Sequence, residues 1–261
     1  MAHFALACRA NGAHSVPGDL PPFFYNGISM PFVFTPPAPA AVPVVGHTQQ
    51  FPVHRIYCVG RNYAEHAKEM GFTGREAPFF FLKPADALIT PQSDGTVRMP
   101  YPSLTSNLHH EIELVVAIGK GGKNIPAAQA LEHIWGYAVG LDMTRRDLQN
   151  DMKKQGRPWC IGKAFEHSAP IGPITPAAQV HGLENAAIWL KVNGQERQRS
   201  NTSQLIWNIA ETIEHLSQAW ALQPGDLIMT GTPEGVAAVE KGDVLEGGVE
   251  GLSPLRVQIT D

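Results

Sequence analysis

The stretch 111–119, EIELVVAIG, constrains this chain more than any other segment. Successive side chains of a β-strand point to opposite faces of the sheet. One face of this strand therefore carries only aliphatic residues, whereas the other starts with Glu111 and Glu113 and continues with Val115 and Ala117. Apolar residues on both faces are typical of a strand that other elements cover on both sides. The sequence thus predicts that these glutamates begin a strand that is covered on both sides for most of its length.

A third carboxylate lies at the end of a second apolar segment, because Asp142 closes 135–142, WGYAVGLD. Buried carboxylates repel one another and are costly to desolvate unless a cation neutralises them. Oxygen ligands without cysteine or a histidine pair favour a hard cation, so we expect Mg²⁺ or Mn²⁺ at Glu111, Glu113 and Asp142. A Glu-x-Glu pair on a strand more often faces solvent, and from the residues alone that alternative stays open.

The remaining patterns predict one α+β domain over 55–261, built on a mixed or antiparallel sheet with helices inserted between strands. Strands are expected at 55–60, 79–83 (FFFLK, a buried strand), 111–119, 135–142, 243–246 and 255–259, with one more strand opening 226–236 and a tight hairpin at Asn193-Gly194. Helices are expected at 62–71, at 127–134, at 144–156 with Thr144 as N-cap, and as an amphipathic stripe over 202–221.

Residues 1–54 are expected to form an extended, poorly structured lead. The segment 34–46, FTPPAPAAVPVVG, is too rich in proline to be helical. Met30 would be a natural translation start, so we interpret residues 1–29 as an upstream extension.

Composition excludes several classes of partner. The net charge is −4 and no run of five or six like charges occurs, whereas a nucleic-acid partner would need a basic patch. No apolar run approaches the length of a membrane-spanning helix, which indicates no membrane partner. The 3 cysteines are odd in number and match no metal spacing, which favours a reducing, cytoplasmic setting.

Beyond these patterns, HHEIELVVAIGKGGKNI followed by GYAVGLDMTRRDLQ closely resembles the metal-binding core of the fumarylacetoacetate hydrolase family. The motifs CVGRNYAEHAKEMG, FFFLKPADALI, GKAFEHSAPIGP and DLIMTGTPEGV match in the family's order, and together the resemblance covers roughly residues 55–261. It implies that Glu111, Glu113 and Asp142 are the metal ligands. It also implies the family's mixed β-sandwich roll with short peripheral helices, usually as a homodimer.

The resemblance also assigns roles to residues that would be ambiguous alone. His66 and Glu69 share a helix face, and such a pair is more often a surface contact. The resemblance makes them the catalytic dyad of a lid segment, with Lys163 as a third catalytic residue. Expected substrate contacts are Arg61, Tyr63, Lys83, Arg146, Gln149, Gly231 and Thr232. His109 and His110 precede the glutamates, but the family's metal ligands are oxygens. Both histidines are therefore expected to pack in the core or to contact the metal ligands without binding the metal.

The implied substrate is a small β-diketo acid whose carbon–carbon bond is hydrolysed. The stretch GRPWCIGKAFEHSAPIGPI is most similar to the bacterial members that act on fumarylpyruvate in gentisate catabolism and release fumarate and pyruvate. An acylpyruvase or an oxaloacetate decarboxylase using the same site is the alternative. A catalytically silent binding protein is a more distant one.

Overall fold

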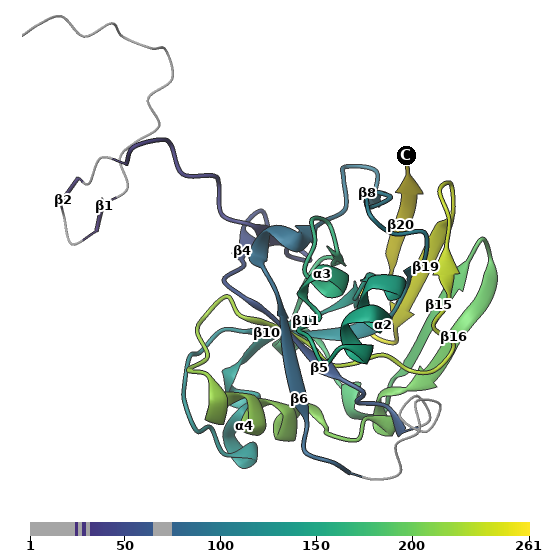
Figure 1. The fold of residues 1–261 in the computed structure, drawn as a ribbon. Coiled ribbons are helices and arrows are strands. Elements are labelled where there is room, and N and C mark those ends of the chain that lie inside the picture. The colour runs from purple at the N-terminus through teal and green to yellow at the C-terminus, as the bar shows by residue number, and fades with distance from the viewer. Residues whose placement is uncertain (1–23, 26–27, 30–31, 65–74) are drawn as a thin grey trace, which may run out of the picture. The chain divides into compact units, whose positions relative to one another are not determined.

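Strand β10 (Ile112–Ile118) lies inside the larger sheet, and every one of its residues is buried. The computed structural model describes residues 24–25, 28–29, 32–64 and 75–261 (Figure 1). The chain divides into two units, Met1–Ala38 and Pro39–Asp261. Within the first unit, the described residues include β1 (Phe24–Tyr25) and β2 (Ile28–Ser29), which pair antiparallel.

The sheet that contains β10 has 6 strands in the order β14-β11-β10-β17-β5-β6. Its other members are β14 (Thr175–Pro176), β11 (Ile134–Leu141), β17 (Leu227–Met229), β5 (Ile56–Gly60) and β6 (Phe79–Lys83). Strands β17 and β5 run parallel, whereas the other neighbours run antiparallel. This mixed sheet confirms the predicted fold class.

A second sheet of 5 strands has the order β16-β15-β19-β20-β8. Its members are β16 (Gln195–Asn201), β15 (Ala187–Val192), β19 (Val244–Val249), β20 (Leu255–Thr260) and β8 (Thr96–Pro100). The predicted hairpin is present between β15 and β16. Asn193 and Gly194 both have positive φ, 51° and 78°, which suits a two-residue turn whose twist matches that of the strands.

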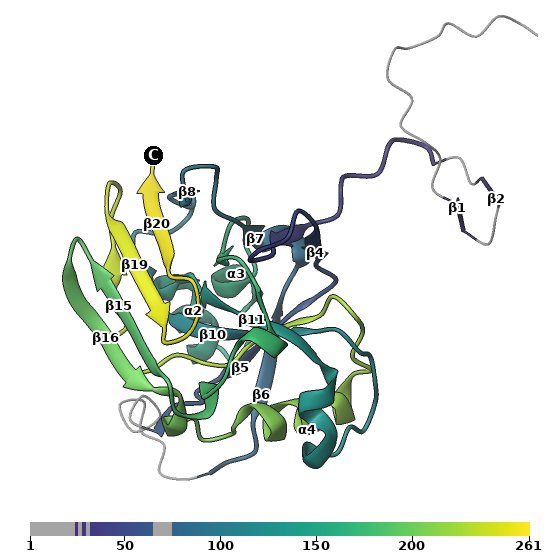
Figure 2. The ribbon, with the colours of Figure 1, turned by 180° about the vertical axis from the view of Figure 1, so that it is seen from behind.

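Strand β10 is covered on both faces, as its sequence predicts. Ile112 and Leu114 pack in the cluster that includes Ile188 and Val257 of the second sheet. Val115, on the other face, packs in a separate apolar cluster. Figures 1 and 2, which view the molecule from opposite sides, show the second sheet flanking the β10 sheet as the second layer of a sandwich.

Short elements complete the fold. The two- and three-residue strands are β3 (Ala41–Pro43), β4 (Gln50–Pro52), β7 (Leu88–Ile89), β9 (Leu108–His109), β12 (Thr144–Arg145), β13 (Ala169–Pro170) and β18 (Ala238–Val239). The α-helices are α2 (Arg146–Lys154), α3 (Cys160–Lys163) and α4 (Ile209–Ala219), and the 3₁₀ turns are η1 (Ala85–Ala87), η2 (Ala127–His133), η3 (Ala177–Gln179), η4 (Leu183–Asn185) and η5 (Thr202–Gln204). No helix among the described residues is long and apolar enough to cross a membrane.

Several element boundaries differ from the predicted ones. Thr144 is not a helix cap, because it pairs with His109 in a short ladder and α2 begins only at Arg146. The amphipathic helix predicted over 202–221 begins at Ile209, where Asn208 and Glu211 form a complete capping box. A strong cap placed inside an amphipathic stripe therefore sets the start of the helix more sharply than the stripe itself.

Two burial assignments also differ. The predicted buried strand FFFLK is β6, the edge of its sheet, and its phenylalanines are half-buried while Leu82 is exposed. The expected lead over 1–54 reaches too far, because the second unit already begins at Pro39. In that stretch Val42 and Phe51 are buried in the core through the β3–β4 hairpin.

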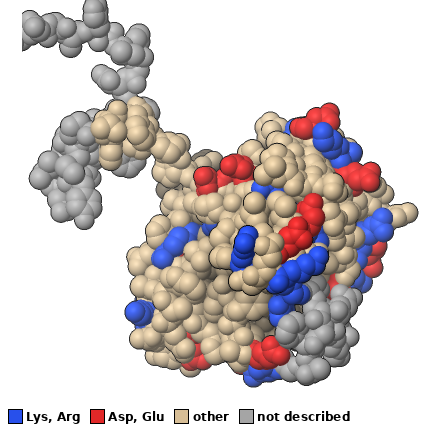
Figure 3. All heavy atoms as spheres, in the orientation of Figure 1, with Lys and Arg blue, Asp and Glu red and all other residues tan. Residues whose placement is uncertain are grey.

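Charged side chains are interspersed on the surface. On the face drawn in Figure 3, Lys and Arg lie next to Asp and Glu in several places, with uncharged surface between these groups. That face therefore presents a mixed charge.

The capping box of α4 yields a stability prediction. Asn208→Ala removes the side-chain acceptor for the Glu211 N–H, so the free energy of unfolding should fall by about 1 kcal/mol. Asn208→Asp keeps an acceptor at the same place and should be close to neutral. Urea denaturation of both variants measures this, and an equal loss in the two would contradict the capping role.

Candidate metal centre and active site

Three carboxylates meet where β10 begins and β11 ends. Glu111 directly precedes β10, Glu113 lies on it, and Asp142 directly follows β11. Antiparallel pairing of Ile112 with Leu141 brings these strand ends together, and the Asp142 N–H donates to the Glu111 carbonyl oxygen at 2.9 Å. One carboxylate oxygen of each of the three residues lies within 4.8 Å of the others, and all three residues are buried.

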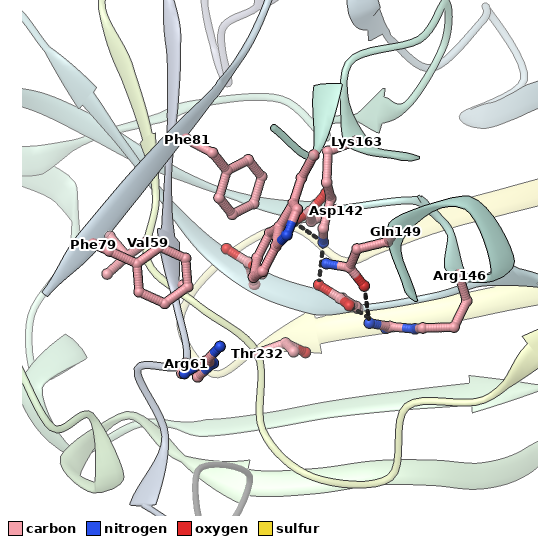
Figure 4. A pocket seen from close by; sticks show the side chains of 13 residues that line it. Val59, Arg61, Phe79, Phe81, Asp142, Arg146, Gln149, Lys163 and Thr232 are labelled. Atoms are coloured by element: carbon pink, nitrogen blue, oxygen red, sulfur yellow. Dashed lines mark hydrogen bonds and ion pairs between the residues drawn. The ribbon is translucent and has the colours of Figure 1, made fainter. Parts of the chain in front are cut away.

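Cationic side chains from separate elements surround two of these carboxylates. The Lys163 ammonium, at the end of α3, is 2.7 Å from a Glu111 oxygen and 2.6 Å from an Asp142 oxygen. Arg146, at the start of α2, pairs with Glu111 (Figure 4). Burial alone would lower the pKa of Lys163, but the carboxylates of Asp142 and Glu111 outweigh it and raise that pKa. Lys163 is therefore a charged ammonium in the metal-free protein.

Glu113 is compensated differently. Its carboxylate accepts the Gly231 N–H at 2.7 Å, and within the described residues no lysine or arginine pairs with it. Burial, and then the negative charges of Asp142 and Glu111, raise the pKa of Glu113 well above its usual range. An added cation would relieve this repulsion. Three carboxylate donors suit Mg²⁺ or Mn²⁺, so the residues present fit the expected ion.

A pocket opens beside the carboxylates, and its opposite wall is aromatic. Phe79 and Trp159 meet edge to face with ring centroids 5.4 Å apart, and Phe81 lies 6.1 Å from the same indole. The guanidinium of Arg61 lies 5.1 Å from the centre of the Phe79 ring (Figure 4). The pocket is lined by Val59, Gly60, Arg61, Phe79, Phe81, Glu111, Glu113, Asp142, Arg146, Gln149, Trp159, Lys163 and Thr232.

Most of the residues predicted from sequence line this pocket, but three take other places. Lys83 is fully buried, with its ammonium 2.9 Å from an Asp142 oxygen, so it supports the carboxylate from behind. Tyr63 is buried in the core cluster next to the second sheet. Gly231, an expected substrate contact, donates its N–H to Glu113 instead. His66 and Glu69 lie outside the described residues.

The two histidines before the carboxylates are held by polar neighbours. His109 Nε2 lies 2.9 Å from the Asn107 side-chain oxygen, and burial followed by the charge of Arg146 lowers the pKa of His109 to about 4. His110 is buried, with Nδ1 2.9 Å from the side-chain oxygen of Gln198. Burial also lowers the pKa of His110, so both imidazoles are neutral at pH 7.

Sequence reasoning missed the aromatic wall and Gln198. Phe79 and Phe81 of FFFLK, which share one face of the strand, were the available signal for the wall, because at a sheet edge one face can line a pocket. Gln198 gave no signal, since it lies on the polar strand QERQRSN.

Comparison with known proteins agrees with this geometry. The model of the fumarylacetoacetate (FAA) hydrolase C-terminal domain matches residues 55–260. The chain belongs to this family. The crystal structure of fumarylpyruvate hydrolase from Pseudomonas aeruginosa, in complex with Mn²⁺ and pyruvate, is 58% identical with a TM-score of 0.86, over 88% of this chain and 99% of that one.

Other curated relatives are named for different activities. "Oxaloacetate tautomerase FAHD1, mitochondrial" from Rattus norvegicus is 42% identical over 78% of this chain and 90% of its own length. "Oxaloacetate decarboxylase, mitochondrial" from Dictyostelium discoideum is 41% identical over 76% of this chain and 89% of its own length. The family and fold predicted from sequence are thus confirmed, while the relatives differ in reaction.

Glu113 yields a prediction about stability. A carboxyl whose pKa is raised on folding stabilises the protein at low pH, and this contribution is lost as pH rises through the raised pKa. Without metal at neutral pH, Glu113→Gln should therefore be more stable than the wild type, by about 1–3 kcal/mol. The difference should shrink toward low pH.

Added Mn²⁺ should reverse that order, because an ion bound only to the folded state stabilises it by about 2.7 kcal/mol at a hundred times Kd. Thermal melting with chelator and with Mn²⁺ measures both effects. Glu240→Gln, at an exposed carboxylate, is the matched control. Equal stabilisation of Glu113→Gln and wild type by Mn²⁺ would rule out Glu113 as a ligand.

Proposed function

We propose that this enzyme hydrolyses 3-fumarylpyruvate to fumarate and pyruvate, with Mg²⁺ or Mn²⁺ held by Glu111, Glu113 and Asp142. The supporting observation is the buried carboxylate group at the wall of a pocket whose other side is aromatic and carries Arg61. The Mn²⁺ and pyruvate of the 58% identical Pseudomonas enzyme support the same assignment.

The polar side of the pocket suits the pyruvyl end of this substrate. When bound, the cation supplies Lewis acidity to the substrate's carboxylate and 2-oxo oxygen. Lys163 and Arg146, which pair with Glu111, line the pocket with positive charge that suits the developing negative charge of a pyruvate enolate. The Gln149 side-chain oxygen accepts from Arg146 at 2.6 Å, which leaves the amide N–H groups of Gln149 to donate to the substrate.

The aromatic side suits the fumaryl end. A conjugated four-carbon acid is flat, so it can lie against the rings of Phe79 and Trp159. Arg61 is held over the Phe79 ring and can pair with the distal carboxylate. An acylpyruvate with a methyl group in that place has nothing for Arg61 to bind, and this difference gives the pocket its selectivity.

The hydrolytic step is assigned to His66, oriented by Glu69, on the strength of the family resemblance, because both lie outside the described residues. His66 takes a proton from a water molecule whose oxygen attacks the carbonyl carbon next to the double bond. The bond from that carbon to the methylene carbon breaks. The water oxygen stays in fumarate, and the methylene carbon is protonated to become the methyl group of pyruvate.

Oxaloacetate decarboxylation is the second candidate, and acylpyruvate hydrolysis is a variant of the first. The relatives named for oxaloacetate chemistry are 41% and 42% identical, and oxaloacetate shares the 2-oxo acid end that the carboxylate side would hold. A silent binding protein is the remaining alternative, and it requires binding without turnover.

The setting of the enzyme is also proposed. Free Cys58 and Cys160 support a reducing cytoplasm. Fumarylpyruvate arises in the breakdown of aromatic compounds such as gentisate, so we place the reaction there. A homodimer is proposed from the family resemblance.

Parallel absorbance assays on fumarylpyruvate, acetylpyruvate and oxaloacetate test the proposed function. With Mg²⁺ or Mn²⁺, kcat/KM should be highest for fumarylpyruvate, and chelation should abolish turnover. His66→Ala should lose turnover while still binding Mn²⁺, which separates catalysis from metal binding. A higher kcat/KM for oxaloacetate would favour the second candidate, and no turnover of any of the three would favour the silent protein.

Arg61 yields a prediction about selectivity. Arg61→Met should lower kcat/KM for fumarylpyruvate by roughly tenfold to a hundredfold, because a charge-assisted hydrogen bond contributes about 1.5–3 kcal/mol. The value for acetylpyruvate should change little. Arg199→Met, at an exposed arginine, controls for charge loss. Equal losses on both substrates would contradict recognition of the distal carboxylate.

A further inference from the structure

Gln198 is a buried amide on a strand that otherwise faces water. Its side chain is almost fully enclosed, at 1% exposure, whereas Glu196 and Arg199 nearby on β16 are exposed. A buried primary amide has two hydrogens to donate and one oxygen to accept, and leaving them unpaired is costly. The partners of Gln198 therefore define which way its amide points.

The orientation of this amide is fixed by two backbone groups that have only one role each. The Ile112 N–H, on β10, can only donate, and it lies 3.1 Å from the Gln198 side-chain oxygen. The Pro233 carbonyl can only accept, and it lies 2.9 Å from the Gln198 nitrogen. Turning the amide over would set donor against donor and acceptor against acceptor.

This orientation decides the role of Thr232. The Gln198 nitrogen lies 2.8 Å from the Thr232 hydroxyl oxygen and must donate to it, so that oxygen accepts. Among the described residues, the Thr232 hydroxyl has no hydrogen-bond acceptor for its own hydrogen. Thr232 also lines the pocket (Figure 4). The hydroxyl is thereby left to donate into the pocket that contains the carboxylates.

We propose that Gln198 is a positioning residue that holds the Thr232 hydroxyl as a hydrogen-bond donor for the keto or enolate oxygen of a bound 2-oxo acid. The inference rests on the proposed function, since it names an oxygen of that substrate. Gln198 acts through Thr232 and does not touch the substrate. Because its oxygen also accepts the Ile112 N–H, the same amide links this loop to the strand that carries Glu113.

A double-mutant cycle with pyruvate as probe tests the inference. Pyruvate Kd is measured by calorimetry on Mn²⁺-loaded protein for the wild type, Gln198→Met, Thr232→Val and the double variant. Each single variant should raise Kd by about threefold to tenfold, the usual cost of losing a hydrogen bond between neutral groups. The double variant should match Thr232→Val, because Gln198 has no hydroxyl left to orient.

Controls separate positioning from folding. Thr232→Ser retains a hydroxyl, so Gln198→Met should have its full effect in that background. Mn²⁺ affinity and melting temperature report whether each variant is folded. If Gln198→Met does not fold, Gln198→Glu serves instead. Its carboxylate keeps an acceptor for the Ile112 N–H but has no amide hydrogen for Thr232, and the same rise in Kd is expected.

Additive losses in the double variant, or an unchanged Kd in a folded Gln198 variant, would overturn the inference. Failure of the wild type to bind pyruvate would instead contradict the proposed function, and the inference would fall with it. The two failures are therefore distinguishable in one set of measurements.

Discussion

Repulsion among three buried carboxylates is the constraint on which the rest of this structure depends. Glu111, Glu113 and Asp142 are buried, and burial together with the negative charges of Asp142 and Glu111 raises the pKa of Glu113. Such a group persists only where positive charge is supplied nearby. The two lysines and the arginine that supply it come from β6, α3 and α2, so the edge strand of the sheet and two helices are tied to the same point.

The three cationic side chains fall into two groups, one buried behind Asp142 and one lining the pocket. Lys83 is fully buried, and its ammonium also donates to the Met143 carbonyl oxygen at 3.2 Å, so it holds Asp142 as part of the framework. Lys163 and Arg146 line the pocket and hold Glu111 from the side open to a ligand. One set of charges is therefore part of the buried framework, while the other faces the pocket.

The sequence predicted the features that depend only on residues close together in the chain. Because side chains alternate along a β-strand, Glu111 and Glu113 were predicted to share one face. The apolar run that ends at Asp142 predicted the third carboxylate at a strand end. The start of α4 was misplaced because an amphipathic stripe continues outside a helix, whereas the cap at Asn208 does not. Gln198 could not be found, since its burial depends on a loop 34 residues away in sequence. The places of Lys83 and Tyr63 likewise follow from tertiary packing.

The parallel pairing of β5 with β17 has a consequence for how substrate range can change. Parallel strands end at the same edge, so the segments after Gly60 and Met229 emerge side by side, and the Asn62 amide donates to the Thr230 carbonyl oxygen at 2.8 Å. The segment after β5 contains Arg61 and the segment after β17 contains Thr232, and both residues lie beyond the paired part of these strands. Changes in these two loops could therefore alter which acyl group is accepted, while the carboxylates at the ends of β10 and β11 stay in place. This separation would let one fold serve several 2-oxo acid reactions.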